Sequence, residues 1–214
     1  MCLQMTRCQG KNYCLMLRRK VDCLTSYRFV TSLCIVDYST VACTDKFGNV
    51  FVLRLPDDAN DDVADSTNMG NSRMLWDQGL LNGAPNKLEL LSHYYLGEAG
   101  TSITKASMKL QGKEVLIVST ITGAIYAFVP AKSKEEVTFF QHLEMFMRQE
   151  YVNLCQRDHL AYRSYFHPVK LTVDADLCER YATLSYSKQR EFADDVDRTP
   201  LEVIKKLEEM RDFI

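Results

Sequence analysis

The chain has 214 residues, of which 46% are hydrophobic and 25% are charged, and its formal net charge is −2. This composition is typical of a globular protein with room for one or two domains. The slightly acidic balance argues against a broad phosphate-binding surface, because nucleic-acid-binding domains are usually strongly basic. The sequence has no run of 18 apolar residues and its start lacks the apolar core of a secretory signal, so we expect neither a transmembrane helix nor secretion.

Cysteines are crowded at the start of the chain. Six of the eight lie at or before Cys43. Without a secretory signal we expect reduced thiols in the cytosol or nucleus rather than disulfides. The first four, Cys2, Cys8, Cys14 and Cys23, are too widely and irregularly spaced for a paired zinc site. We therefore expect no metal and no cofactor.

A hairpin occurs twice in the chain. Residues 41–53 align with 116–128, 75 positions later (116 − 41), with matching apolar positions and Gly48 on Gly123. Each copy predicts a strand, a tight turn that needs glycine, and a second strand. A repeated hairpin is typical of β-propellers, whose blades hold four strands each.

The other strand signals lie around these hairpins. Residues 1–27 have no clear hydrophobic period and are expected to be an atypical segment or a mispredicted gene start. An apolar, β-branched run at 29–36 predicts a strand, as do the patterns at 88–96, 102–110, 114–120 and 125–129. The polar stretch 57–72, rich in aspartate, predicts a solvated acidic loop. Its calcium-loop pattern fails, because Val63 replaces the required glycine and Met69 the required glutamate.

The β pattern stops at Pro130, and helical patterns follow. Ser133 and Glu136 form a capping-box signature, and the next helices are predicted near 174–184, 187–195 and 199–213. The last has a capping box from Thr199 and a proline at its first position. Its expected buried stripe is Leu201, Ile204, Leu207 and Met210, and Glu202 is expected to pair with Lys206.

These patterns predict a mainly β fold with α: a partial β-propeller followed by a helical region. The predicted boundaries are 1–27, 28–130 for about two blades, and 131–214 for the helices. A propeller needs at least four blades to close. We therefore expect the chain to be a fragment of a longer protein, or to complete its propeller with other polypeptide.

No catalytic constellation assembles from the sequence. Phosphate-binding glycine loops and the nucleophile elbow are absent, and the adjacent pair Asp158 and His159 cannot orient itself into a triad. We expect no enzymatic activity. An aromatic and basic cluster allows two interpretations, a packed domain junction or a phosphate-binding surface, and the acidic net charge favours the junction. Its members are Arg157, Tyr162, Arg163, Tyr165, Phe166 and Lys170.

Many short runs resemble a known family over residues 28–214. The runs are 45–49 (DKFGN), 75–77 (LWD), 79–84 (GLLNGA), 97–98 (GE), 139–142 (FFQH), 157–160 (RDHL), 163–165 (RSY), 168–170 (PVK), 176–179 (DLCE) and 197–200 (DRTP). The family contains the large subunit of the cleavage and polyadenylation specificity factor and that of the damaged-DNA-binding protein. The chain is most similar to the C-terminal end of its splicing-factor-3b branch.

This resemblance implies the last blades of a seven-bladed, WD40-like propeller and a C-terminal helical domain. It also implies a non-enzymatic nuclear scaffold for spliceosome assembly, within the branch-site-recognising small nuclear ribonucleoprotein. The implied partners are the HEAT-repeat subunit and a small subunit of the splicing factor 3b complex, with RNA contacted indirectly and no membrane or small-molecule substrate. The alternative is a nucleic-acid-binding C-terminal module, as in the polyadenylation or DNA-damage relatives.

Partner contacts are expected on loops at the strand ends, because loops on a rigid scaffold commonly carry binding residues. The candidates are Asp45, Lys46, Phe47, Glu98, Thr120 and Thr122. The alternative is that these residues only shape their turns.

Overall fold

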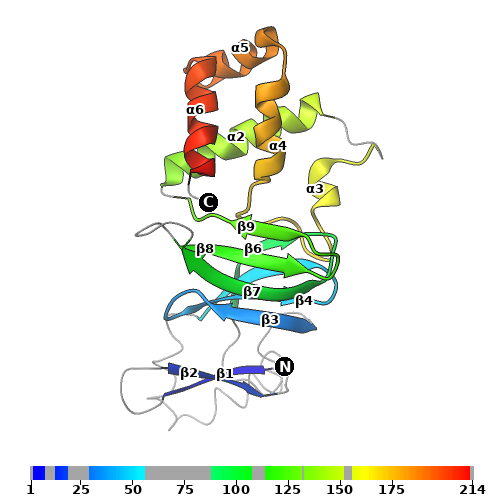
Figure 1. The fold of residues 1–214 in the computed structure, drawn as a ribbon, viewed down its shortest axis with the longest axis vertical. Coiled ribbons are helices and arrows are strands. Elements are labelled where there is room, and N and C mark those ends of the chain that lie inside the picture. The colour runs from blue at the N-terminus through cyan, green and yellow to red at the C-terminus, as the bar shows by residue number, and fades with distance from the viewer. Residues whose placement is uncertain are drawn as a thin grey trace, which may run out of the picture.

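The computed structural model places strands first and helices after them (Figure 1). It describes residues 2–7, 13–18, 29–55, 88–107, 114–131, 133–151 and 156–212. The predicted acidic loop 57–72, with its rejected calcium pattern, lies outside the described residues. The fold is mixed β and α with antiparallel sheets, and no closed barrel forms in the described part of the chain.

Two short strands occur where the sequence showed no period. β1 (Cys2–Arg7) pairs with β2 (Tyr13–Arg18) as an antiparallel two-stranded sheet. The sequence missed both because each strand has six residues, which leaves only three positions on a face.

Two further sheets are antiparallel meanders, in which each strand pairs with the next. The first has the order β3 (Val30–Ile35), β4 (Thr40–Asp45), β5 (Asn49–Arg54), β6 (Glu89–Tyr95). The second has the order β7 (Gly100–Ser107), β8 (Glu114–Thr120), β9 (Ile125–Phe128). The first three strands of the first sheet thus correspond to the whole of the second.

The repeated hairpin is confirmed in its backbone pairing. Val41 pairs with Leu53 in the first copy, and Leu116 pairs with Phe128 at the equivalent position of the second. Both turns hold a glycine in the left-handed region, with φ of 93° at Gly48 and 92° at Gly123. In both sheets the pairing of the first two strands shifts register at the equivalent place. The shift lies between Val30 and Ser32 in the first sheet and between Gly100 and Ser102 in the second.

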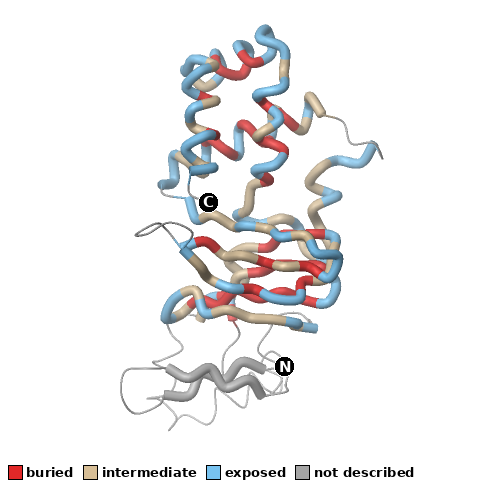
Figure 2. Tube along the Cα trace, in the orientation of Figure 1, coloured by how far each residue is buried: buried red, intermediate tan, exposed pale blue. Residues whose placement is uncertain are grey.

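The sheets pack face to face, and a shared core lies between them. Strand alternation sends Ala42 and Val50 of the first sheet toward Ile103 and Val118 of the second. The first strands of the two sheets, β3 and β7, approach closely, since the Thr31 hydroxyl donates to the Gly100 carbonyl at 2.5 Å. β4 is buried along its whole length (Figure 2). Continuous burial on both faces explains why its sequence does not alternate strictly.

The helices form a second core. They are α2 (Lys134–Glu150), α3 (His159–Tyr162), α4 (Ala175–Glu179), the 3₁₀ helix η3 (Arg180–Thr183), α5 (Tyr186–Asp195) and α6 (Pro200–Arg211). Leu143 and Met147 of α2 pack with Tyr181 of η3 and Phe192 of α5. Burial raises the pKa of the Tyr181 hydroxyl to about 12, and that hydroxyl donates to the Gln189 carbonyl at 2.6 Å.

The expected face of α6 was partly wrong. Leu201 is 78% exposed, whereas Val203 is fully buried and packs with Leu207. The Thr199 capping box is confirmed, and positions 203 and 207, four residues apart, lie on the same face of the helix toward the core. The sequence pattern could not tell whether Leu201 or Val203 faces the core, because both are apolar.

The expected pair between Glu202 and Lys206 was also wrong. The Glu202 carboxylate accepts the Thr199 backbone N–H at 2.8 Å as part of the cap. Lys206 instead lies 3.5 Å from carboxylate oxygens of both Glu136 and Glu209. A cap bond to the backbone has therefore replaced the surface pair.

The two equivalent glycines give a controlled test of the first turn. A Cβ on Gly48 would lie 2.8 Å from the Glu98 backbone nitrogen, whereas a Cβ on Gly123 would meet nothing within 4 Å. Gly123→Ala should cost about 1–2 kcal/mol from left-handed strain alone. Gly48→Ala should cost a further ~1–3 kcal/mol, because the clash is with backbone. Urea unfolding of both variants checks this, and equal losses would contradict the close contact.

Candidate functional site

Three turns meet at one end of the two sheets, and all six candidate contact residues lie on them. The turn after β4 is tied to the turn after β6, because the Leu96 N–H donates to the Gly48 carbonyl at 2.8 Å. The turn after β8 is tied to the same segment, because the Ile121 N–H donates to the Ala99 carbonyl at 3.0 Å. The sequence placed these residues in separate loops, and the fold joins the loops into one surface.

Asp45 and Thr120 occupy equivalent positions of the repeat and both shape their turns. Asp45 is 1% exposed, and its Oδ1 accepts the backbone N–H groups of Phe47 at 3.0 Å and Asn49 at 2.8 Å. Thr120 Oγ1 accepts the backbone N–H of Ala124 at 3.1 Å. For these two candidates the geometry favours the turn-shaping alternative.

Glu98 joins the second and third turns through its side chain. One carboxylate oxygen accepts hydrogen bonds from the Thr120 hydroxyl, at 2.7 Å, and from the Thr122 hydroxyl. The bonds from Thr122 and Thr120 hold the pKa of Glu98 below its usual value. The carboxylate therefore stays charged and fixed in position at the surface.

Lys46 and Phe47 are the candidates that reach solvent from the first turn. Phe47 is 37% exposed, and its ring contacts Phe29 at 5.8 Å and Tyr165 at 6.2 Å between centroids. The Lys46 ammonium lies 4.8 Å from the centre of the Phe29 ring. These contacts connect the strand ends to the segment that precedes α4. A contact role for the six candidates remains a prediction.

A second site, missed by the sequence analysis, is centred on the buried carboxylate of Asp174. Its Oδ2 atom accepts hydrogen bonds at 2.9 Å from the Tyr94 hydroxyl and from Arg163 Nε, and His159 Nε2 lies at the same distance. Its Oδ1 atom accepts the Leu177 N–H at 3.3 Å and caps α4. One carboxylate therefore links β6, α3 and α4.

The surroundings of Asp174 decide its charge. Burial alone would raise the pKa of this carboxyl, but the bond from His159, the positive charge of Arg163 and the bond from Tyr94 together hold it well below its usual range. The backbone N–H of Asp174 donates to Glu144 of α2 at 3.2 Å. Burial raises the pKa of Glu144, so the two carboxyls are shifted in opposite directions.

The segment before α4 also pairs with β6 through its backbone. His93 and Lys170 exchange two N–H···O bonds of 3.0 Å, and the Tyr95 N–H donates to the Arg163 carbonyl at 3.1 Å. Lys170 Nζ donates to the Leu90 carbonyl at 2.6 Å. Arg163 and Lys170, two members of the predicted aromatic and basic cluster, thus form hydrogen bonds that join this segment to β6.

No group of three or more histidine, cysteine or acidic residues is arranged to hold a metal ion within the described ranges. Burial raises the pKa of the Cys178 thiol, which therefore remains protonated at neutral pH. None of the helices that the structure describes is long and apolar enough to cross a membrane.

Residues 24–183 match the family described as "CPSF A subunit region". The chain belongs to this family. Residues 24–183 include both meanders, the junction at Asp174 and all six candidate contact residues. The match extends through η3 and stops before α5.

Curated proteins of the splicing branch are similar over most of this chain. Splicing factor 3B subunit 3 of Danio rerio is 48% identical over 86% of this chain, and a probable splicing factor 3B subunit 3 of Dictyostelium discoideum has the same identity and coverage. Spliceosome-associated protein 130 A of Arabidopsis thaliana is 46% identical over 90% of it. The resemblance to the splicing-factor-3b branch is therefore confirmed. The chain covers only 14–16% of the length of these relatives.

Removing the charge of Asp174 should loosen the junction. Asp174→Asn leaves the Arg163 cation without its counter-charge, and breaking a buried pair in this way costs about 3 kcal/mol or more. Asp176→Asn is the matched control, because this exposed residue lies on the same helix and should cost less than about 1 kcal/mol. Urea unfolding of the 214-residue chain measures both, and similar losses would contradict a central role for Asp174.

The low pKa of Asp174 also predicts a dependence on pH. A carboxyl whose pKa is lower in the folded chain contributes stability that is full above the unfolded value of about 3.9 and disappears as pH falls through the folded value. The stability difference between wild type and Asp174→Asn should therefore be constant from neutral pH down to about 5 and shrink below about 4. A difference that grows on acidification would contradict the assignment.

Proposed function

We propose that the chain is part of a splicing-factor-3b subunit that acts as a non-enzymatic scaffold in pre-mRNA splicing. The observation that carries this proposal is the 48% identity to splicing factor 3B subunit 3 over 86% of the chain. Such a scaffold works in the nucleus, within the branch-site-recognising ribonucleoprotein. Its proposed partners are the HEAT-repeat subunit and a small subunit of the same complex.

In this proposal the two meanders are neighbouring blades at the end of a seven-bladed propeller. Their repeated register, their equivalent glycine turns and the close contact of β3 with β7 support this assignment. Residues 28–130 then form the end of the propeller and 131–214 the helical domain. The Asp174 junction holds the helices against β6, which fixes the orientation of one part on the other.

The proposed scaffold acts through its surface, because surface turns tied together by hydrogen bonds suit protein–protein contact better than chemistry. Glu98 and Thr122 share a hydrogen bond at the end of the sheets, and Phe47 is partly exposed on a turn that is hydrogen-bonded to the turn of Glu98. Loops on a rigid support are common binding sites. We therefore retain Lys46, Phe47, Glu98 and Thr122 as the contact candidates, with Asp45 and Thr120 shaping the turns that present them.

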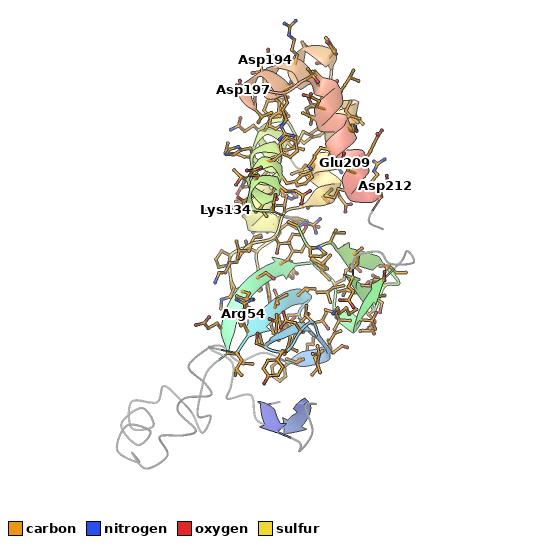
Figure 3. All side chains as sticks on the ribbon, turned by 90° about the vertical axis from the view of Figure 1, so that its left-hand side faces the viewer. Arg54, Lys134, Asp194, Asp197, Glu209 and Asp212 are labelled. Atoms are coloured by element: carbon orange, nitrogen blue, oxygen red, sulfur yellow. The ribbon has the colours of Figure 1, made fainter. Side chains whose placement is uncertain are left out.

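A direct nucleic-acid-binding role is the second candidate, and the contacts of the basic side chains weigh against it. Arg163 is held by Asp174 and Lys170 by a backbone carbonyl, so neither is available to a phosphate. The helical part carries acidic side chains from α5 to the end of α6, at Asp194, Asp197, Glu209 and Asp212 (Figure 3). Fluorescence anisotropy with labelled oligouridine at low salt separates the two candidates, because phosphate binding strengthens as salt falls.

Affinity capture tests the scaffold role. The 214-residue chain, carrying an affinity tag, is incubated with nuclear extract, and bound proteins are identified by mass spectrometry. We expect the HEAT-repeat splicing subunit among them. Recovery of only polyadenylation or ubiquitin-ligase subunits would reject the splicing assignment.

Substitution of the exposed turn residues should weaken this capture without unfolding the chain. Phe47→Ala and Glu98→Ala each remove a surface group, and truncation at an interface hot spot commonly costs ~2 kcal/mol or more, which is roughly a 30-fold loss of affinity. Tyr186→Ala is the matched control, since Tyr186 is 70% exposed on the helical part. Unchanged capture by both turn variants would reject these residues as contacts.

A further inference from the structure

Four aromatic rings form a continuous strip across the junction between the sheets and the helical region. We call Phe29, Phe47, Tyr165 and Phe166 the aromatic strip. Their centroids are separated by 5.8 Å, 6.2 Å and 4.5 Å in that order. Phe29 is 59% exposed and Phe166 83% exposed. The strip thus presents aromatic surface to solvent from three separate parts of the chain.

The strip is held in place by a backbone hydrogen bond at one end and by ring stacking on β6 at the other. The Lys46 N–H donates to the Phe29 carbonyl at 2.9 Å, which fixes the start of β3 on the first turn. Tyr165 is stacked on Tyr95 of β6, with centroids 5.1 Å apart and an interplanar angle of 22°. A surface whose anchors are already ordered loses little conformational entropy when it binds.

Phe166, between the bridged residues Tyr165 and His167, is the member of the strip with an unfavourable backbone conformation. Its φ is +61°, a left-handed conformation that bulky residues rarely adopt. Its ring nevertheless remains almost fully exposed, so burial within this chain does not offset the strain. Strained residues that persist in this way cluster at binding sites.

The charge beside the strip indicates what it would bind. The Lys46 ammonium lies 4.8 Å and 5.5 Å from the ring centres of Phe29 and Phe47, and it pairs with no carboxylate of the described residues. The neighbouring carboxylate, Asp45, is buried in its own turn. A ligand that covers the strip therefore meets aromatic faces and, among the described side chains that lie over its rings, one cation, Lys46.

We propose that the aromatic strip docks a peptide segment of a partner protein, one that places an aromatic or leucine side chain next to a carboxylate. The apolar side chain packs on Phe47 and Phe166, and the carboxylate pairs with Lys46. Aromatic anchors with few acidic groups are typical of interface centres. A single-stranded nucleic acid fits less well, because it needs a groove of cations along its backbone, and Lys46 is the one described cation that lies over the rings of the strip. The inference rests on the proposed scaffold role only for its biological setting.

Peptide selection tests the proposal on the 214-residue chain. A random dodecamer phage library is panned against wild type, and the most enriched peptide is titrated calorimetrically. We expect enriched peptides to carry an aromatic residue or leucine beside aspartate or glutamate. Phe166→Ser should weaken the selected peptide at least ~10-fold, as loss of a hot-spot aromatic commonly does. Leu171→Ser is the matched control, since Leu171 is 68% exposed and also left-handed, with φ of 48°.

The charge is tested by reversing it. Selection on Lys46→Glu should enrich lysine or arginine beside the apolar residue in place of the acid. No enrichment, equal weakening by Leu171→Ser, or displacement of the peptide by oligouridine would overturn the proposal. A bound acidic peptide together with failure to capture splicing subunits would reject the splicing assignment and leave the docking surface intact.

Discussion

The buried carboxylate of Asp174 is the interaction on which the arrangement of this molecule depends. Three side-chain nitrogen or oxygen atoms lie 2.9 Å from one of its oxygens, and they come from β6 and from the segment around α3. Its other oxygen caps α4. A charge in this position is costly to bury unless all its partners are in place. This electrostatic requirement and the backbone pairing of β6 with the segment before α4 together order the sheets and helices relative to each other.

The surface features follow from that requirement together with the repeated sheets. The repeat places turns of the same shape at one end of both sheets, and close backbone contacts join them. The junction brings Tyr165, which contacts Phe166, beside Phe47, which is more than 100 positions earlier in the chain. An aromatic surface made from such distant segments exists only while the junction holds. In the proposed scaffold, the docking surface therefore depends on buried polar contacts.

The features that the sequence predicted are local or repeated ones. The twin hairpin and the Thr199 cap depend on residues within a few positions of each other, so their patterns survive without knowledge of the fold. Asp174 shows the limit, because Tyr94 lies 80 positions away and no periodicity connects the two. The sequence pattern marked position 174 only as the start of a predicted helix at 174–184, with no sign that the aspartate would be buried.

Other features were missed or wrongly predicted from the sequence for different physical reasons. Leu201 and Val203 of α6 are both apolar, so the hydrophobic pattern could not tell which of them faces the core. The structure exposes Leu201 and buries Val203. The short helix α3 has four residues, fewer than a hydrophobic period needs to be visible. The left-handed φ of Phe166 cannot be foreseen from an aromatic residue, since such residues disfavour it. The candidate turns were located correctly, but their association into one surface required the packing of the two sheets.

A double-mutant cycle between Tyr94 and Asp174 tests most directly whether this carboxylate couples the sheet to the helices. The free energies of unfolding of wild type, Tyr94→Phe, Asp174→Asn and the double variant are measured in urea at neutral pH. Residues that share one hydrogen-bond network typically show coupling of about 0.5–3 kcal/mol. We predict a stabilising coupling in that range. Additive losses within about 0.3 kcal/mol would contradict it, because independent sites add in this way.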